Sequence, residues 1–409
     1  MTVTAPPQRP RPREHERPDD LEALIEEARR RARRRRLRNA AAAVAAAAIA
    51  AGALAAWHAG NSGTSAQAIA PPALPKPKPI PLRPVPRNGE IAVVQGNDLI
   101  AVAPDGSRKR RLTTCPGPYA DCNFGAFSWS PDGRSLVFLA GHIGGAFTLN
   151  SLSLYSVAAY GSPSRLVARC GDCNQYQELS WSPDGQRVVF AADNGLYVAN
   201  VVSGLLRRID LRAAERAALD GPGAGTTATW SPSGSSIAVA ARNELYTVSP
   251  DGSGVARIAF IGGGVSDPKW SPDGTRLAFD SGDDLYVVDE DGSHLKLLLG
   301  GAYGSGPGVP TWSPDGRRIL YFYTPGSSGS FRGEVWSMRA DGSDRRLLYN
   351  GSCCVGEWHP PIWSPDGRWI AFSGATETSG VVVMDVRGTH RRKLLDLSSA
   401  VAWRPLPRS

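Results

Sequence analysis

The sequence predicts an all-β fold, a seven-bladed β-propeller of four-stranded antiparallel blades, preceded by one transmembrane α-helix. Three observations predict it. A Trp-Ser-Pro-Asp-Gly motif recurs through the C-terminal part of the chain, alternating apolar strands fill the intervals between turn signals, and residues 40–56 form an uncharged alanine-rich run. The 45 glycines and 33 prolines of the 409 residues suit a fold with many short strands and tight turns.

The repeat is marked by tryptophans spaced 40 to 52 residues apart, a range that fits four-stranded blades with loops of variable length. The last copy is degenerate and consists of Trp403-Arg404-Pro405. The repeat tryptophans are Trp129, Trp181, Trp230, Trp270, Trp312, Trp363 and Trp403.

Each repeat has the same order of strands and turns. A strand ends in Trp, and Ser-Pro-Asp-Gly follows as a tight turn, because Pro presets φ and Gly accepts a backbone conformation that strains other residues. The second strand alternates, as in 276–279, the third resembles 285–288 and ends in an Asp-Gly turn, and the fourth is basic and then apolar, as in 345–348.

The two ends of the repeat region are incomplete in complementary ways. Residues 89–113 contain a second, third and fourth strand without a preceding Trp strand, and 400–403 form a Trp strand with nothing after it. Pairing them would complete one blade and leave no free sheet edge at the seam, which predicts seven blades. Six blades remain the alternative if the first unit or the long 129–168 unit is irregular.

These motifs closely resemble the WSPDG repeat of the TolB-type propellers, which are related to the WD-repeat families. The resemblance covers residues 89–409, and six near-complete motif copies make it specific. It implies a β-propeller fold for this part of the chain. The chain departs from the family in two ways, because TolB-type propellers are usually six-bladed and no second N-terminal domain is evident here.

Residues 39–57 are expected to span a membrane. As a helix they would extend about 28 Å, close to the hydrocarbon core of a bilayer, and Trp57 lies where an interfacial aromatic belongs. Eight arginines between Arg29 and Arg38 place the N-terminus in the cytoplasm and the propeller outside. A cleaved signal peptide, with secretion of the propeller, and a soluble alanine-rich helix are the alternatives.

The flanking segments are expected to be a tail and a stalk. Residues 1–38 hold 12 Arg against 7 acidic residues and form a basic cytoplasmic tail with a short helix. Residues 58–88 form a proline-rich stalk in which 71–86 favour polyproline II. The remaining 89–409 hold 30 basic and 31 acidic residues, so no nucleic-acid partner is expected for the folded domain.

Binding residues are expected in the long, irregular loops on one face of the propeller, because variable loops on a rigid scaffold commonly carry function. In an antiparallel blade the second-to-third and fourth-to-first connections share that face. The binding-face candidates are Tyr119, His142, Phe331, Trp358 and His359.

All six cysteines lie in the fourth-to-first connections. Their local pairing and the expected location outside the cytoplasm favour disulfides that staple these loops. The candidate pairs are Cys115–Cys122, Cys170–Cys173 and the vicinal Cys353–Cys354. A metal site is the competing interpretation, because Cys170 and Cys173 have zinc-ligand spacing and His359 follows the last pair.

No catalytic motif was found, and no cofactor or metal is expected. The sequence contains no Gly-x-Ser-x-Gly elbow, and His142, His294 and His390 fall in different repeats without a common pattern. The aspartates Asp283, Asp284, Asp289 and Asp291 resemble a calcium site, but Asp-Gly turns explain most of them.

The leading hypothesis is therefore a non-enzymatic binding or scaffold module of the bacterial cell envelope that recognises a protein, peptide or glycan. Two alternatives stand beside it: a metal-dependent propeller hydrolase or lyase, and a transmembrane sensor that signals through the basic N-terminal tail. Fold alone does not decide among them.

Overall fold

The structure is a computed structural model, and it describes residues 87–116, 122–144, 148–169, 178–192, 195–209, 226–301, 306–326, 333–351, 360–374, 380–396 and 401–406. Within these ranges no helix is long and apolar enough to cross a membrane. The predicted tail, transmembrane helix and most of the stalk lie outside the described residues.

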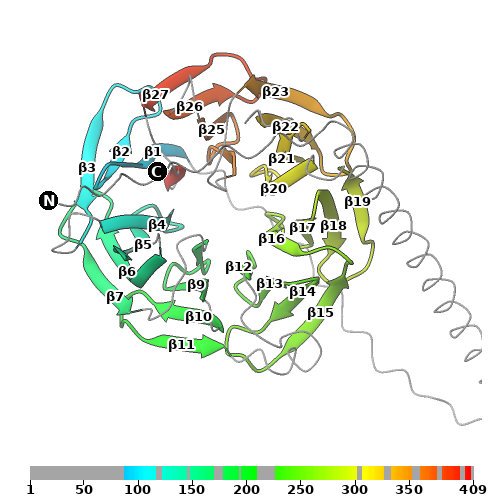
Figure 1. The fold of residues 1–409 in the computed structure, drawn as a ribbon, viewed down its shortest axis with the longest axis horizontal. Helices are drawn as coiled ribbons and strands as arrows, with labels where there is room; N and C mark the ends of the chain where they lie inside the picture. Colours follow the sequence, from blue (N-terminus) through cyan, green and yellow to red (C-terminus); the bar gives the residue numbers. More distant parts are fainter. Residues whose placement is uncertain are drawn as a thin grey trace, which may run out of the picture. The chain divides into compact units, whose positions relative to one another are not determined.

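The described strands form seven four-stranded antiparallel sheets arranged around a common centre (Figure 1). Blade 1 consists of β28 (Val401–Leu406), β1 (Arg87–Gln95), β2 (Asp98–Val102) and β3 (Lys109–Thr114). Blade 2 consists of β4 (Cys122–Trp129), β5 (Ser135–Gly144), β6 (Thr148–Ala158) and β7 (Arg165–Arg169). Blade 3 consists of β8 (Ser180–Trp181), β9 (Arg187–Ala192), β10 (Gly195–Asn200) and β11 (Leu206–Ile209).

The other four blades repeat this order without exception. Blade 4 consists of β12 (Thr227–Trp230), β13 (Ile237–Ala241), β14 (Glu244–Val248) and β15 (Val255–Phe260). Blade 5 consists of β16 (Val265–Trp270), β17 (Arg276–Ser281), β18 (Asp284–Asp289) and β19 (Lys296–Leu299). Blade 6 consists of β20 (Gly306–Trp312), β21 (Arg318–Thr324), β22 (Gly333–Arg339) and β23 (Arg346–Gly351). Blade 7 consists of β24 (Ile362–Trp363), β25 (Trp369–Gly374), β26 (Gly380–Asp385) and β27 (Arg392–Asp396).

The closure of the ring is confirmed. β28 pairs antiparallel with β1, with Trp403 opposite Ile91 and Val401 opposite Val93. β1 begins at Arg87, two residues before the predicted start of the propeller, because Arg87 and Asn88 pair with Leu406 and Pro405 beyond a bulge. The seven-bladed prediction is therefore correct, and the six-bladed alternative is excluded.

The hydrophobic core is divided into seven clusters, and each cluster lies between two neighbouring blades. The cluster that contains Ile91 and Trp403 joins the last blade to the first. In blades 2, 3 and 5 a Phe of the second strand stacks on a Tyr of the third, as Phe279 does on Tyr286 with ring centroids 5.6 Å apart. Because each blade is buried against its two neighbours, closure of the ring adds the cluster between the last blade and the first.

The repeat tryptophans link the blades by hydrogen bonds as well as by packing. The indole N–H donates to the carbonyl oxygen of the residue that precedes the tryptophan of the previous blade. Five such bonds are described: Trp129 to Ala402 (3.2 Å), Trp181 to Ser128 (3.1 Å), Trp270 to Thr229 (3.4 Å), Trp312 to Lys269 (2.9 Å) and Trp363 to Thr311 (3.2 Å). In these five repeats the indole therefore joins neighbouring blades, whereas the indole N–H groups of Trp230 and Trp403 are buried without a partner.

The residues after each tryptophan form a turn with its own hydrogen-bond network. In blade 5 the buried Ser271 hydroxyl donates to the Asp273 carboxylate (2.6 Å) and accepts from the Arg276 amide (3.0 Å), while the Gly274 amide donates to the Ser271 carbonyl (2.8 Å). Gly274 has a φ of 72°, a conformation that favours glycine. Ser233 replaces the aspartate in blade 4 and hydrogen-bonds with Ser231 (2.9 Å).

The degenerate last copy carries Arg404 where the other copies have serine. Its buried guanidinium donates from Nε to the Gly133 carbonyl (2.7 Å), pairs with Glu90 (3.3 Å) and lies 5.3 Å from the Trp129 ring centroid. Glu90 also pairs with Arg110. Arg404 therefore connects the C-terminal strand to both the first and the second blade.

Candidate functional site

The two faces of the propeller differ in the length of their connections. On one face, called here the short-turn face, each connection between described strands has five or six residues. On the opposite, long-loop face the connections range from two residues (96–97) to 17 residues (210–226). The strand boundaries therefore show the predicted difference in loop length between the two faces.

The first strand of each blade lies innermost in the ring (Figure 1) and begins at the long-loop face. Two positions in each repeat, one and three residues before the tryptophan, lie at this start. In blades 1, 6 and 7 they include Ala402, Val309 and Ile362, but in blades 3, 4 and 5 they are polar. The polar set is Glu178, Ser180, Thr227, Thr229, Asp267 and Lys269.

An ion pair joins two blades that are not neighbours. The Lys269 ammonium on β16 of blade 5 donates to Glu178, which precedes β8 of blade 3. Since β12 of blade 4 lies between them, this contact runs along the channel side of that strand. The side chains are 18% and 32% exposed, so the pair is partly withdrawn from water. Burial opposes the charge of Lys269, but the carboxyl groups of Glu178 and Asp267 outweigh it and hold the pKa of Lys269 above its usual range.

Asp267 lies two residues before Lys269 in a strained part of β16. Its φ is 49°, although it is not glycine and is followed by Pro268, and a bulge separates Ser266 from Lys269. The Asp267 amide donates to the Thr227 hydroxyl of blade 4 (2.9 Å). Burial, together with the charge of Glu178, raises the pKa of Asp267 to about 7, although Lys269 opposes the rise.

Asp280 on β17 supplies a third carboxyl group. Its side chain is 8% exposed, and the Ser266 hydroxyl donates to Oδ2 (2.6 Å). The Val309 backbone amide of blade 6 also donates to this carboxyl group. Burial raises the pKa of Asp280 to about 6, against the opposing effect of the Ser266 hydrogen bond and the Lys269 charge.

We call Glu178, Asp267, Lys269 and Asp280 the channel cluster. It combines three carboxyl groups with one ammonium. Buried carboxyl groups with raised pKa values, beside a charged partner, are typical of functional sites. None of its members was predicted from the sequence, although charged residues one and three positions before the repeat tryptophan were a signal that could have been followed.

Most of the predicted binding-face residues fall outside the described part of the chain. Tyr119, Phe331, Trp358 and His359 lie outside it, and His142 lies on β5, where its backbone pairs with that of Cys122. The side chains of His142 and Cys122 are not described. The prediction for these residues therefore remains a prediction.

The cysteines are described in part. Cys115 is buried and disulfide-bonded, and its amide donates to the Asn97 carbonyl (2.8 Å). Pairing of Cys115 with Cys122 remains a prediction, because the Cys122 side chain lies beyond what the structure describes. Cys170, Cys173, Cys353 and Cys354 also lie outside the described residues.

Two histidines share a local pattern, contrary to the expectation that the histidines have none in common. His294 and His390 occupy equivalent turns with φ values of 52° and 50°, and Nδ1 of each lies 2.8 Å from the aspartate five residues earlier, Asp289 or Asp385. The preceding Ser293 or Thr389 hydroxyl contacts the same Nδ1. A catalytic relay needs the acid and the hydroxyl on opposite ring nitrogens, so these sets are turn structures.

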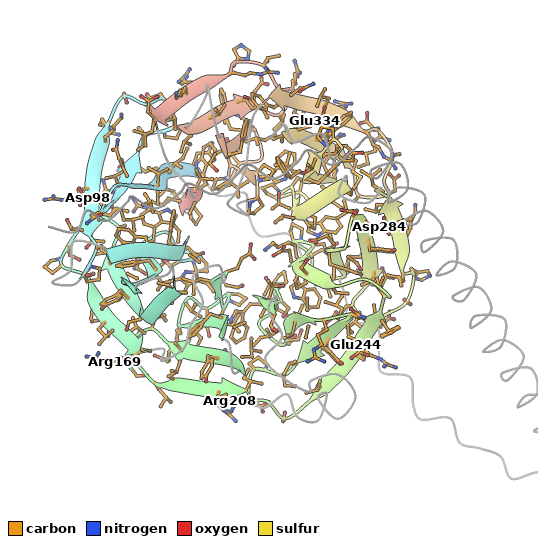
Figure 2. The ribbon with its side chains drawn as sticks, viewed as in Figure 1. Asp98, Arg169, Arg208, Glu244, Asp284 and Glu334 are labelled. Atoms are coloured by element: carbon orange, nitrogen blue, oxygen red, sulfur yellow. The ribbon has the colours of Figure 1, made fainter. Side chains whose placement is uncertain are left out.

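Acidic residues at the start of the third strands form a second repeated feature, but each has a local partner. Figure 2 labels Asp98, Glu244, Asp284 and Glu334 in the outer part of the ring, away from its centre. Glu244 and Asp284 accept from Tyr246 and Tyr286, and Glu334 accepts from the Trp336 indole (2.7 Å). Across the described ranges no three His, Cys, Asp or Glu residues lie close enough to hold a metal ion.

A cavity of about 550 Å³ lies between residues 111–114 of blade 1 and residues 160–164 of blade 2. It is open and is lined by hydroxyl groups, Arg111, Tyr160 and apolar side chains, without a carboxylate, histidine or cysteine. The channel cluster is therefore the stronger candidate site, because it joins partly buried charges from separate blades.

Fold and repeat together define the class: a closed seven-bladed propeller built on Trp-Ser-Pro-Asp-Gly turns. Residues 179–360, which run from just before β8 of blade 3 to just before β24 of blade 7, match the family model of the TolB beta propeller domain. This part of the chain therefore has the sequence of a TolB-type β-propeller. No curated protein matches the sequence.

Solved structures with a similar fold include several different activities. The chain is similar to TolB from Acinetobacter baumannii, with 18% identity over 78% of this chain and 67% of that one and a TM-score of 0.49. It is also similar to an oligogalacturonate lyase in complex with manganese, with 15% identity over 79% and 86% of the chains and a TM-score of 0.52. A xyloglucanase from Xanthomonas campestris matches with 14% identity over 78% and 53% and a TM-score of 0.57. At these low identities, the structural likeness establishes the fold alone and leaves the activity open.

Proposed function

We propose that this protein is a membrane-anchored binding module of the cell envelope that recognises a protein or peptide partner through its long-loop face. The observation that carries the proposal is the asymmetry of the two faces, five or six residues in every short turn against connections of up to 17 residues opposite. Asp267 and Lys269 lie on β16, which begins at that same face. A rigid ring that holds long loops at one end suits recognition.

The binding face can be tested by exchanging loops. Replacing residues 210–226 by a six-residue Gly-Ser linker should abolish recovery of the partner in a cross-linking and pull-down experiment. The matched control replaces 249–254, a short turn of six residues, by the same linker. Equal recovery with both variants would refute the assignment of the binding face.

The anchor can be tested separately. We expect the full chain to sediment with membranes and to resist extraction by carbonate, and a chain without residues 39–57 to be released. Protease added to intact cells should cleave the propeller but not the arginine-rich tail. Release of an untruncated propeller into the medium would instead support signal-peptide cleavage.

An enzymatic role is the alternative, and metal analysis separates it from binding. A stoichiometric manganese, calcium or zinc ion in the purified full chain would favour a metal-dependent hydrolase or lyase. The binding module requires none.

A further inference from the structure

We propose that the outer hairpins of blades 2 and 3 dock on an anionic lipid bilayer, with apolar side chains at the membrane interface and arginines against the headgroups. An outer hairpin is here the third and fourth strand of a blade with their connection, residues 148–169 in blade 2 and 195–209 in blade 3. The inference rests on the proposed membrane anchor and assigns the surface by which the anchored propeller contacts the bilayer.

The charge of these two hairpins sets them apart from the other five. They contain no aspartate or glutamate, and their four exposed arginines are Arg165, Arg169, Arg207 and Arg208. Each of the other five outer hairpins holds at least two acidic residues, as blade 1 does with Asp98 and Asp105. Arg169 and Arg208 lie at the outer rim of the ring (Figure 2). Blades 2 and 3 therefore bring positive charge to the rim without a counter-charge in the same hairpins.

The same hairpins carry the most exposed large apolar side chains. Tyr160, Val202 and Leu205 are 83%, 76% and 69% exposed, the highest values among the large hydrophobic residues that the structure describes. All three belong to connections of the short-turn face, where the other five hairpins have Asp-Gly or Arg-Gly turns. Exposed apolar side chains beside arginines, without acidic residues, are typical of surfaces that lie in the headgroup region of a bilayer.

Contacts between the two blades make the hairpins one surface. Arg165 of β7 donates to the Val201 carbonyl oxygen of blade 3. A Cβ on Gly204 would lie only 2.9 Å from the Val167 carbonyl oxygen of β7. The connection between β10 and β11 therefore packs directly on β7, so the exposed side chains of both hairpins can meet the same flat partner.

Tyr160 is held in place although it is exposed. The guanidinium carbons of Arg404 and Arg110 lie 5.2 Å and 6.0 Å from its ring centroid, within the range of cation–π contacts. The ring also borders the open cavity of about 550 Å³, whose lining includes Arg111 and hydroxyl groups but no carboxylate. Tyrosine is enriched at membrane interfaces, and the cavity beside it offers donors to a phosphate headgroup.

The course of the chain favours a bilayer over a soluble acidic partner. β1 begins at Arg87, which pairs with Leu406 at the short-turn end of the strand, so the predicted stalk enters at the face that carries these connections. Residues 58–70 contain no proline, unlike 71–86, and we expect the stalk to bend there. A tether keeps the bilayer at a high effective concentration, so a modest docking surface is sufficient.

The test is hydrogen exchange of the full chain in nanodiscs of phosphatidylcholine alone and of phosphatidylcholine with phosphatidylglycerol. With the anionic lipid we expect amides of 159–166 and 201–208 to exchange about tenfold more slowly, since each arginine near an anionic surface contributes about 1 kcal/mol. Val202→Asp/Leu205→Asp should remove the difference. Both side chains are exposed, and unchanged protection of β9 in the same measurement verifies that this variant folds.

Phe260→Asp is the matched control, because Phe260 is 62% exposed on blade 4, outside the two hairpins, and this variant should keep the difference. Three results would overturn the proposal: no slowing with the anionic lipid, equal slowing in both kinds of nanodisc, or slowing that persists in Val202→Asp/Leu205→Asp. Slowing by soluble polyglutamate and not by lipid would assign the surface to an acidic protein instead.

The anchor and the binding face are measured separately. Exchange of 39–57 in the same nanodiscs reports insertion of the anchor. If the chain does not insert, the hairpin amides are compared with and without phosphatidylglycerol vesicles, so the docking surface is tested even where the anchor is wrong. Partner recovery by the 210–226 variant reports the long-loop face alone.

Discussion

At the scale of single residues, Asp267 and Asp280 are carboxyl groups whose surroundings disfavour their charge. Their pKa values rise to about 7 and about 6 because they are buried, whereas an ordinary aspartate ionises near 3.8. The folded state therefore keeps protons between pH 4 and pH 7 that the unfolded chain releases. The stabilisation is complete below pH 4 and is lost as the pH rises through 6 to 7.

We expect the free energy of unfolding of the wild-type protein to fall between pH 4.5 and pH 7.5, relative to the Asp267→Asn/Asp280→Asn double variant. The difference should be on the order of a few kcal/mol, since one unit of pKa shift corresponds to about 1.4 kcal/mol. Denaturant unfolding at a series of pH values measures it. Parallel pH profiles for the two proteins would show that the pKa values of these carboxyl groups are not raised.

Asp344 should show the opposite dependence. Hydrogen bonds from Arg346 and Arg318 lower the pKa of Asp344 to about 2, so its stabilisation is present above pH 4 and is lost as the pH falls toward 2. Asp344→Asn should therefore lower the melting temperature at pH 7 and have no effect at pH 2. Thermal unfolding followed by circular dichroism gives both values, and an effect independent of pH would contradict the assignment.

Arg404 is expected to contribute more to stability than any surface arginine. Arg404→Ala removes a buried guanidinium with contacts to Gly133, Glu90 and Trp129, which should cost about 2–4 kcal/mol. Arg134→Ala is the matched control, because Arg134 is 87% exposed and lies 3.9 Å from Asp132. That change should stay within about 0.5 kcal/mol. Similar losses for the two variants in urea unfolding would refute the role of Arg404 in closure.

At the scale of elements, the turns contribute to closure of the ring as well as the strands do. Gly133 and Gly96 both have positive φ, 66° and 58°, but a Cβ on Gly133 would lie 1.9 Å from the Pro405 carbonyl oxygen, whereas a Cβ on Gly96 would meet nothing within 4 Å. The conformational strain of alanine is similar at the two positions. The difference in stability cost between the two Gly→Ala variants therefore measures the contact of the first motif turn with the closing strand β28.

We expect Gly96→Ala to cost about 1–2 kcal/mol and Gly133→Ala to cost clearly more, because β28 or its turn must move. Hydrogen exchange should show loss of protection in β28 and β1 for Gly133→Ala and only local changes for Gly96→Ala. Equal protection in the two variants would mean that the turn adapts to the methyl group without displacing β28.

The strands themselves were predictable because their signals are local. Alternation in 276–279, the Asp-Gly turns and the motif tryptophans lie within a few residues of one another, and each specifies its own strand or turn. The bulge between Ser266 and Lys269 was not predictable in this way. It depends on the contact of Asp267 with Thr227 in the neighbouring blade, which a pattern within one repeat does not contain.

At the scale of the whole molecule, we expect stability to depend on closure of the ring, because the seven hydrophobic clusters each lie between two neighbouring blades. Deleting 401–409 removes β28, exposes the edge of β1 and opens the cluster of Ile91 and Val93. We expect this variant to lose cooperative unfolding and to aggregate, as measured by near-UV circular dichroism and light scattering. Deletion of 407–409 alone is the control and should leave both signals unchanged. A cooperative transition in the longer deletion would show that an open ring is stable.

The sequence alone predicted the blade repeat and the pairing of the two ends, because each Trp-Ser-Pro-Asp-Gly unit carries its own turn chemistry and strand periodicity, but it left six blades as the alternative to seven. The tertiary structure alone decided that Glu178 and Lys269, 91 residues apart, meet across blade 4, and that Asp280 is buried near Lys269. The physical reason is that a repeat fixes the contacts within a blade. The environment of a charged side chain depends instead on which other blades surround it once the ring has closed.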